Sequence, residues 1–123
     1  MISNTIKPVS AQKFEFKLVN KQGENIRVIF DLDNQKLNVD RSKSGLTDFS
    51  SKFADNISES PLVKKSSYKI RLLVDKASTE LFVNDGELVQ TNLIFPSEPF
   101  NSLIFDSVDG TINIENLSAY NMD

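Results

Sequence analysis

The chain has 123 residues, of which 39% are hydrophobic and 25% charged, so it can bury one core but is too short for two ordinary domains. The formal net charge of -3, with acidic and basic residues interspersed, offers no basic footprint for nucleic acid or for an anionic membrane surface. Cysteine and histidine are absent, which excludes disulfides, thiolate metal sites and histidine-dependent catalysis. No stretch has the length and apolarity of a membrane span or a signal peptide. We expect one domain over residues 1–123, with no metal, cofactor, nucleic-acid or membrane partner.

The first half of the chain contains three segments typical of half-buried strands. Residues 13–19 (KFEFKLV) alternate apolar and polar side chains, and so do residues 26–32 and 36–40. Short polar turns separate them, at 20–24 and at 33–35. The pattern predicts a three-stranded antiparallel meander.

A long polar segment follows, from Asp40 to Ser67, and we expect it to be a loop. Its sizeable apolar residues are few and include Phe49 and Phe53. Loops of this length inside a compact domain often carry function. The alternative is a crossover between two sheets that these two phenylalanines anchor, and the sequence favours this second interpretation slightly.

The stretch from Tyr68 to Pro96 predicts two consecutive hairpins. With a turn at 75–78, Val74 lies opposite Thr79, Leu72 opposite Leu81 and Ile70 opposite Val83, which makes one face apolar across both strands. On the other face, Arg71 lies opposite Phe82.

The second turn, at 84–87, contains an Asp-Gly pair, which tolerates positive φ. A two-residue loop would place Leu81 opposite Gln90, whereas a glycine bulge would place it opposite Val89. We expect the bulge.

The last part of the chain predicts a short strand at 102–105, a hairpin turn at 106–110 and a final strand at 111–120. Ile112, Ile114 and Leu117 are expected to face inward, with a bulge near Glu115 and Asn116 where the apolar phase changes. No segment shows a sustained helical period. About eight short strands therefore indicate an all-β fold, an antiparallel β-sandwich of two packed sheets with a jelly-roll or concanavalin-like arrangement.

Candidate chemical sites are sparse. The segment 31–35 begins like a calcium loop but lacks the later glycine and glutamate, so a hairpin turn is the better interpretation. Carboxylate pairs can hydrolyse glycosides, yet acids in turns lack the burial that raises a catalytic pKa. Arg71, Glu80, Asp85 and Glu87 form either a surface ion pair with turn residues or a sugar site, since carboxylate and guanidinium groups can each hold two adjacent hydroxyls.

Two motifs, in this order and spacing, resemble the carboxy-terminal β-sandwich of glycoside hydrolase family 32, which includes levanases, inulinases and invertases. The first is Asp-Arg-Ser-Lys-Ser-Gly at 40–45. The second is the run 71–87 (RLLVDKASTELFVNDGE), followed by Thr91-Asn92 and by Ile94-Phe95-Pro96. The similarity extends from about Phe14 to Tyr120.

The resemblance implies an accessory sandwich attached to a five-bladed β-propeller that holds the catalytic acids. The propeller motifs Asn-Asp-Pro, Arg-Asp-Pro and Glu-Cys are missing from this chain. We therefore expect no catalysis by the chain itself. It is interpreted as a domain excised from a larger hydrolase of fructans or sucrose, a parent enzyme that would be secreted or periplasmic, with the amino-terminal propeller of the same chain as its partner.

The resemblance also extends to the family 66 carbohydrate-binding modules, which bind the terminal fructose of levan through acidic residues and an arginine. This implies an alternative function, fructan binding. The candidate ligand-binding residues are Arg71, Asp85 and Glu87, with Asp40, Arg41 and Glu80 as outer members. The sequence leaves open which fructan linkage the parent enzyme prefers.

Overall fold

The computed structural model describes residues 2–8, 10, 12–41, 57–63, 65–75, 78–84, 88–93, 100, 102–108 and 110–119. Within these ranges the chain forms strands and connections, and none of the described segments is a helix long and apolar enough to cross a membrane. The strands are β1 (Ile2–Pro8), β2 (Lys13–Val19), β3 (Asn25–Asp31), β4 (Lys36–Asp40), β5 (Ile57–Pro61), β6 (Tyr68–Val74), β7 (Ser78–Val83), β8 (Leu88–Leu93), β9 (Ser102–Val108) and β10 (Ile112–Ala119).

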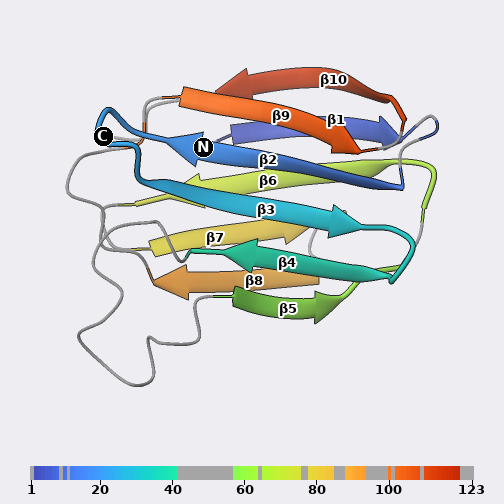
Figure 1. The fold of residues 1–123 in the computed structure, drawn as a ribbon, viewed down its shortest axis with the longest axis horizontal. Coiled ribbons are helices and arrows are strands. Elements are labelled where there is room, and N and C mark those ends of the chain that lie inside the picture. The colour runs from blue at the N-terminus through green and yellow to red at the C-terminus, as the bar shows by residue number, and fades with distance from the viewer. Residues whose placement is uncertain are drawn as a thin grey trace.

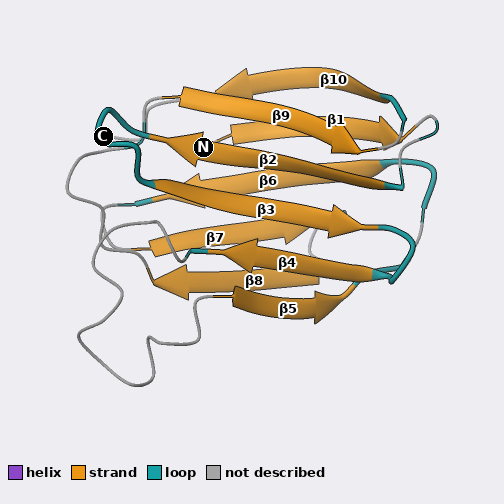
Figure 2. Ribbon diagram, in the orientation of Figure 1, coloured by secondary structure: helices purple, strands orange, loops and turns teal. Residues whose placement is uncertain are grey.

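The strands form two five-stranded antiparallel sheets stacked face to face (Figures 1 and 2). One sheet has the order β10-β1-β6-β7-β8, and the other has the order β5-β4-β3-β2-β9. β9 and β10 lie together at one edge of the sandwich, and β5 and β8 lie at the opposite edge. The all-β sandwich predicted from the sequence is confirmed.

The core lies between the sheets and is built from the apolar side chains that face inward at every second position of the strands. Phe14 and Phe30 stack on neighbouring strands with ring centroids 4.6 Å apart. Tyr68, from the other sheet, packs against them at 6.0 Å from Phe14 and 5.5 Å from Phe30. All three side chains are fully buried. Because aromatic rings bury large areas and prefer stacked or tilted contacts, this cluster joins the two layers at their centre.

Most of the predicted pairings are found in the structure. β2, β3 and β4 form the expected meander, and β6 pairs with β7 in the expected register, with Leu72 opposite Leu81 and Ile70 opposite Val83. Arg71 lies opposite Phe82 as predicted. These pairings follow from the period-two pattern, because a slip of one residue would turn the apolar side chains to the solvent face.

Two strands of the structure were not predicted from the sequence. β1 lies between β10 and β6, and its inner positions include the polar Asn4, so its apolar alternation is weak. β5 lies within the segment expected to be a loop, and pairs with β4 at the sheet edge. Its sequence, Ile-Ser-Glu-Ser-Pro, has one large apolar residue, which is typical of a short edge strand. Phe49 and Phe53 lie outside the described residues, so their predicted anchoring role stays a prediction.

The bulge predicted for the second hairpin is wrong. Leu81 lies opposite Gln90, and Phe82 lies opposite Val89. Gln90 is buried, and its Nε2 donates to Ser60 Oγ of β5 at 2.8 Å. This hydrogen bond satisfies an amide that faces inward, and Val89 is left on the outer face.

The hairpin predicted between the last two strands is also wrong. β9 continues through the expected turn as far as Val108 and pairs with β2, whereas β10 pairs with β1 in the other sheet. The connection after β9 therefore crosses between the layers, as does the connection after β1. The two crossings meet where Thr111 N donates to Ser10 Oγ at 3.1 Å.

The predicted bulge in the last strand is confirmed, since the β1–β10 register shifts between Ser3 and Thr5 and Asn116 has a φ of 55°. Ile114 lies opposite the buried Ile6, so it faces inward as expected. Ile114 is 37% exposed and Leu117 51% exposed, so the core does not cover either side chain fully. Both lie on an edge strand, beyond which the chain provides no described cover.

Tyr68 also holds the connection between β5 and β6. Its hydroxyl donates to Val63 O at 3.0 Å and accepts from Lys65 N at 2.8 Å. Replacing Tyr68 with phenylalanine keeps the ring packing but leaves both backbone groups without this partner. We expect the Tyr68→Phe chain to lose about 1–3 kcal/mol of unfolding free energy, measured by urea denaturation. Thr91→Val, which removes an exposed hydroxyl, is the control, and an equal effect of the two changes would contradict the prediction.

Candidate functional site

The predicted ligand-binding residues do not form one cluster. Arg71 and Glu80 lie on the outer face of the sheet that contains β6 and β7, where they alternate with buried residues. Asp40 ends β4 in the other sheet and points to the opposite outer face, and Arg41 follows it. Asp85 and Glu87 lie outside the described residues. The described candidates are thus divided between the two faces of the sandwich.

Arg71 makes an aromatic contact, and it forms no ion pair with Glu80 among the described side chains. Its guanidinium carbon lies 5.4 Å from the centroid of the Phe82 ring. Glu80 lies opposite Leu73 on one side and Thr91 on the other. A guanidinium over a ring at this distance is a cation–π contact, worth about 0.5–1 kcal/mol at an exposed site. The predicted surface ion pair is wrong for this pair.

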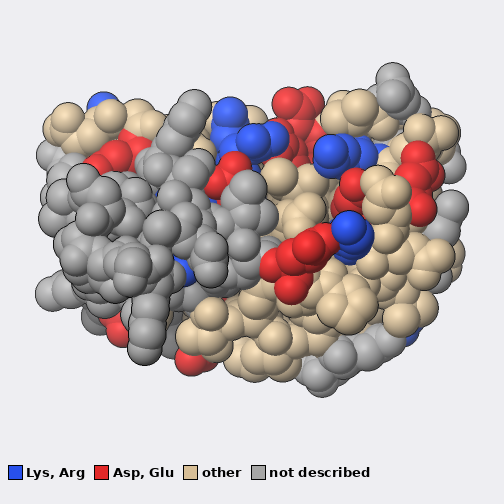
Figure 3. Space-filling model, turned by 60° about the horizontal axis from the view of Figure 1, so that its bottom comes forward, with Lys and Arg blue, Asp and Glu red and all other residues tan. Residues whose placement is uncertain are grey.

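Asp40 belongs to a charged ladder on the other sheet. Arg27 binds Glu15 with an NH2–Oε2 distance of 2.8 Å, and its NH1 lies 3.8 Å from Asp40 Oδ2. Figure 3 shows acidic and basic side chains interspersed on the visible surface, without one dominant sign. The Arg27 side chain is 43% exposed, whereas those of Glu15 and Asp40 are only 17% and 18% exposed, so this ladder is partly buried. The alternating signs suit a face that contacts solvent.

The Asp31 carboxylate accepts hydrogen bonds from within its own turn. Asp31 Oδ2 accepts from Asn34 Nδ2 at 2.9 Å, and Oδ1 accepts from Asn34 N at 3.2 Å. These bonds lower the pKa of Asp31, chiefly through the Asn34 side chain, while partial desolvation opposes the shift. Within the described part of the chain, no group of three or more His, Cys, Asp or Glu residues is arranged to hold a metal ion. The geometry is that of the hairpin turn favoured by the sequence.

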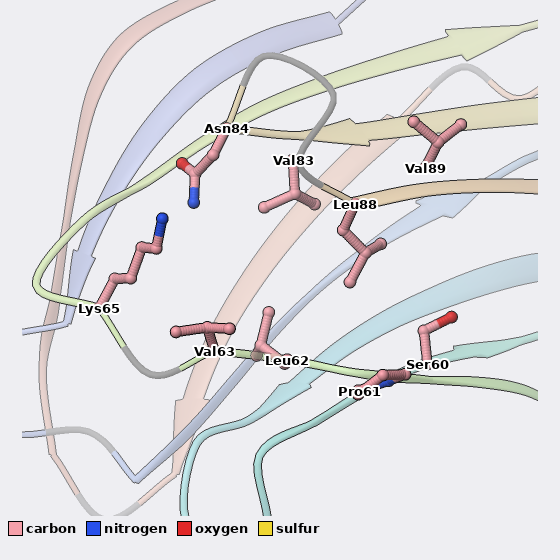
Figure 4. A pocket seen from close by; sticks show the side chains of 9 residues that line it. All are labelled: Ser60, Pro61, Leu62, Val63, Lys65, Val83, Asn84, Leu88 and Val89. Carbon is pink, nitrogen blue, oxygen red and sulfur yellow. The ribbon is translucent and has the colours of Figure 1, made fainter.

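The structure contains a pocket that the sequence did not predict. It has a volume of about 310 Å³ and lies at the edge where β5 and β8 approach each other (Figure 4). Its walls come from the end of β5, the connection to β6, the end of β7 and the start of β8. The lining residues are Ser60, Pro61, Leu62, Val63, Lys65, Val83, Asn84, Leu88 and Val89.

Two hydrogen-bond donors point toward each other beside this apolar lining. Asn84 Oδ1 accepts from Lys69 N at 2.9 Å, and this bond leaves the amide nitrogen of Asn84 facing the Lys65 ammonium (Figure 4). Asn84 itself has a φ of 53°, a left-handed conformation that asparagine tolerates. Two donors beside an apolar surface suit a ligand that offers both an apolar face and oxygen acceptors.

The pocket supports binding better than catalysis. Among the described residues that line it there is no carboxylate, so none of those residues can act as the acid or nucleophile of a glycosidase. Asn84 was recognised in the sequence as a turn residue, but nothing in the local pattern connected it with Lys65. Two lining residues, Asn84 and Leu88, flank in sequence the stretch 85–87, which contains the predicted residues Asp85 and Glu87 and lies outside the described residues.

The Asp31 turn yields a pH-dependent prediction. Because the folded-state pKa of Asp31 is lowered, its contribution to stability is present above the unfolded pKa of about 3.9 and is lost as the pH falls through the lower folded value. We expect Asn34→Ala to raise the pKa of Asp31 and to weaken the loss of stability below about pH 4. NMR titration of the carboxyl carbons measures the pKa, with Asn113→Ala, at an exposed position of β10, as control. An unchanged titration of Asp31 in Asn34→Ala would contradict the assignment.

The comparisons with known proteins agree on one family. The profile described as Glycosyl hydrolases family 32 C terminal matches residues 1–121. A levanase of Bacillus sp. (strain L7) is 36% identical over 112 residues, which are 90% of this chain and 12% of that protein. A levanase of Bacillus subtilis (strain 168) is 33% identical over 116 residues, which are 94% of this chain and 17% of that protein.

A solved structure indicates the same family. The exo-inulinase from Aspergillus awamori superimposes with a TM-score of 0.77 and 28% identity, over 94% of this chain and 23% of the inulinase chain. The chain thus spans less than a fifth of either levanase and about a quarter of the inulinase. Both the sequence match and the superposition cover nearly all of its described strands. The chain therefore belongs to the family of C-terminal β-sandwich domains of family 32 glycoside hydrolases.

Proposed function

We propose that this chain is the accessory β-sandwich of a hydrolase acting on fructans or sucrose, and that it stabilises the catalytic propeller while performing no catalysis itself. On this proposal residues 1–123 are one domain of a longer polypeptide. The observation that carries it is the match of residues 1–121 to a family of C-terminal domains. In the two levanases, the matched region is only 12% and 17% of the full length. The relatives are named levanases and an exo-inulinase, which supports a fructan-degrading context.

The side chains of the described region support the non-catalytic part of this proposal. Several carboxylates of the described strands and turns have structural contacts. Asp31 accepts hydrogen bonds within its turn, Glu15 pairs with Arg27, and Glu59 pairs with Lys36 at 2.9 Å. A glycosidase needs two carboxyl groups across a substrate cleft, one of them held in a less polar environment. Acids that already bind cations on solvated strands are poorly suited to that role.

Exposed apolar side chains support the stabilising part. Large hydrophobic residues on the surface include Ile104, Val108, Ile114 and Leu117 on β9 and β10. Ile104 and Val108 lie on the outer face of their sheet, opposite Lys17 and Lys13, whereas Ile114 lies opposite the buried Ile6 in the other sheet. Apolar side chains exposed on both edge strands favour contact with another domain. Interfaces between domains of one chain are built from such surfaces.

Deletion of residues 1–123 from the longer protein tests this function. We expect the remaining catalytic part to unfold at a temperature lower by several degrees, because it loses an interface and exposes apolar surface. Differential scanning calorimetry measures the change, and sucrose and levan hydrolysis by the purified chain is assayed alongside. An unchanged unfolding temperature, or turnover by the 123-residue chain alone, would refute the proposal.

Fructan binding is a second candidate function, and the pocket beside Asn84 favours it. The pocket combines an apolar lining with the donors Asn84 Nδ2 and Lys65 Nζ, and a sugar ring offers both an apolar face and hydroxyl acceptors. Its lining residues Asn84 and Leu88 are close in sequence to Asp85 and Glu87, the residues to which the family resemblance assigns sugar recognition.

Titration of the chain with fructose, levan and inulin tests this second function. We expect weak binding, with a Kd on the order of 1 mM, seen as chemical-shift changes at Val63, Asn84 and Val89. Lys65→Met keeps the apolar stem but removes the charge and should weaken binding, as should Asp85→Ala. Lys17→Met, on β2 in the other sheet, is the matched control. The absence of any shift at millimolar ligand would eliminate this function.

A further inference from the structure

The pocket at the β5–β8 edge presents a hydrogen-bond donor in a fixed orientation. Asn84 is held to Lys69 by two bonds, from Asn84 N to Lys69 O at 2.7 Å and from Lys69 N to Asn84 Oδ1 at 2.9 Å. Because the amide oxygen is engaged in this way, the Nδ2 group is the part of the amide that faces Lys65. Figure 4 shows the two nitrogen atoms on the same side of the pocket.

Two further oxygens of the described lining are engaged as acceptors. Ser60 Oγ accepts from Gln90 Nε2 at 2.8 Å, and Val63 O accepts from the Tyr68 hydroxyl at 3.0 Å. The described lining also includes no Asp or Glu. This part of the wall is therefore richer in donors than in acceptors that a ligand could use.

The rest of the described lining is aliphatic and partly open to water. Leu62 and Val83 are buried, whereas Val63 is 61% exposed and Val89 is 52% exposed. An apolar body that covers these side chains removes their surface from water, which favours binding. The volume of about 310 Å³ is at the lower end for ligand pockets and suits a small molecule.

We propose that this pocket binds a small aliphatic monocarboxylate, with the carboxylate between Lys65 Nζ and Asn84 Nδ2 and the aliphatic body against the apolar lining. A carboxylate only accepts hydrogen bonds, whereas each neutral hydroxyl of a sugar also has a proton to donate. A bond between an ammonium and a carboxylate is also stronger than a neutral one. This inference goes beyond fructan binding, because it requires no sugar and assigns the pocket to a different class of ligand.

Titration of the isotope-labelled chain with hexanoate, and with hexanol as its neutral counterpart, tests the assignment. We expect hexanoate to shift the amide signals of Val63, Leu88 and Val89 with a Kd on the order of 1 mM. Hexanol should bind about tenfold more weakly, since it lacks the charge. Added salt should weaken the binding of hexanoate and leave that of hexanol unchanged, because salt screens the attraction to Lys65.

Substitutions at the two donors separate the head group from the apolar contacts. Lys65→Met removes the charge, and Asn84→Asp keeps an oxygen for Lys69 N while it replaces the donor with a second acceptor. We expect each change to weaken hexanoate binding about tenfold and to leave hexanol binding within about twofold of wild type. Lys65→Arg retains a cation and should still bind hexanoate. Asn113→Asp, at an exposed position of β10, is the matched control and should leave both affinities unchanged.

The outcomes also separate this inference from fructan binding. Equal affinity for hexanoate and hexanol, no shift at millimolar hexanoate, or full hexanoate binding by Lys65→Met would overturn the carboxylate assignment. Fructose binding without hexanoate binding would refute this inference and leave the fructan function standing. Hexanoate binding that Asp85→Ala does not weaken, without any shift by fructose, would support this inference and eliminate the fructan function.

Discussion

The packing of Tyr68 against Phe14 and Phe30 joins the two sheets, and the remaining features of the molecule depend on it. Each ring comes from a different strand, and the tyrosine crosses from one layer to the other. The same tyrosine binds the backbone at Val63 and Lys65 through its hydroxyl. One side chain thus connects the centre of the core to the loop that forms a wall of the pocket. A buried aromatic residue with a polar tip is suited to this double role, because its ring packs while its hydroxyl satisfies backbone groups.

A sandwich of two open sheets has two edges, and in this molecule the side chains at the two edges differ. The β5–β8 edge is closed by Leu62 and by a buried glutamine, and it carries the pocket. The β9–β10 edge leaves Ile114 and Leu117 partly exposed. Edge strands with unpaired backbone groups attract partners unless they are covered.

The charged residues of the described strands contribute to solubility and local geometry more than to a reactive site. Asp31 caps its own turn, Arg27 pairs with Glu15, and Arg71 lies over a phenylalanine ring. None of these contacts brings two carboxylates together around a cleft. In the longer relatives this fold is the C-terminal part of a glycoside hydrolase.

The sequence by itself determined the strands in which apolar and polar residues alternate cleanly, such as 13–19 and 68–74, the pairing of Arg71 with Phe82, and the family. Only the tertiary structure decided the rest: the partners of β9 and β10, the inward position of Gln90, the strands β1 and β5, and the pocket between Lys65 and Asn84. The reason is that alternation is a local property, because each residue's face follows from its neighbours two positions away. The choice of sheet for an edge strand, and the meeting of residues from separate loops, depend on contacts between parts of the chain far apart in sequence.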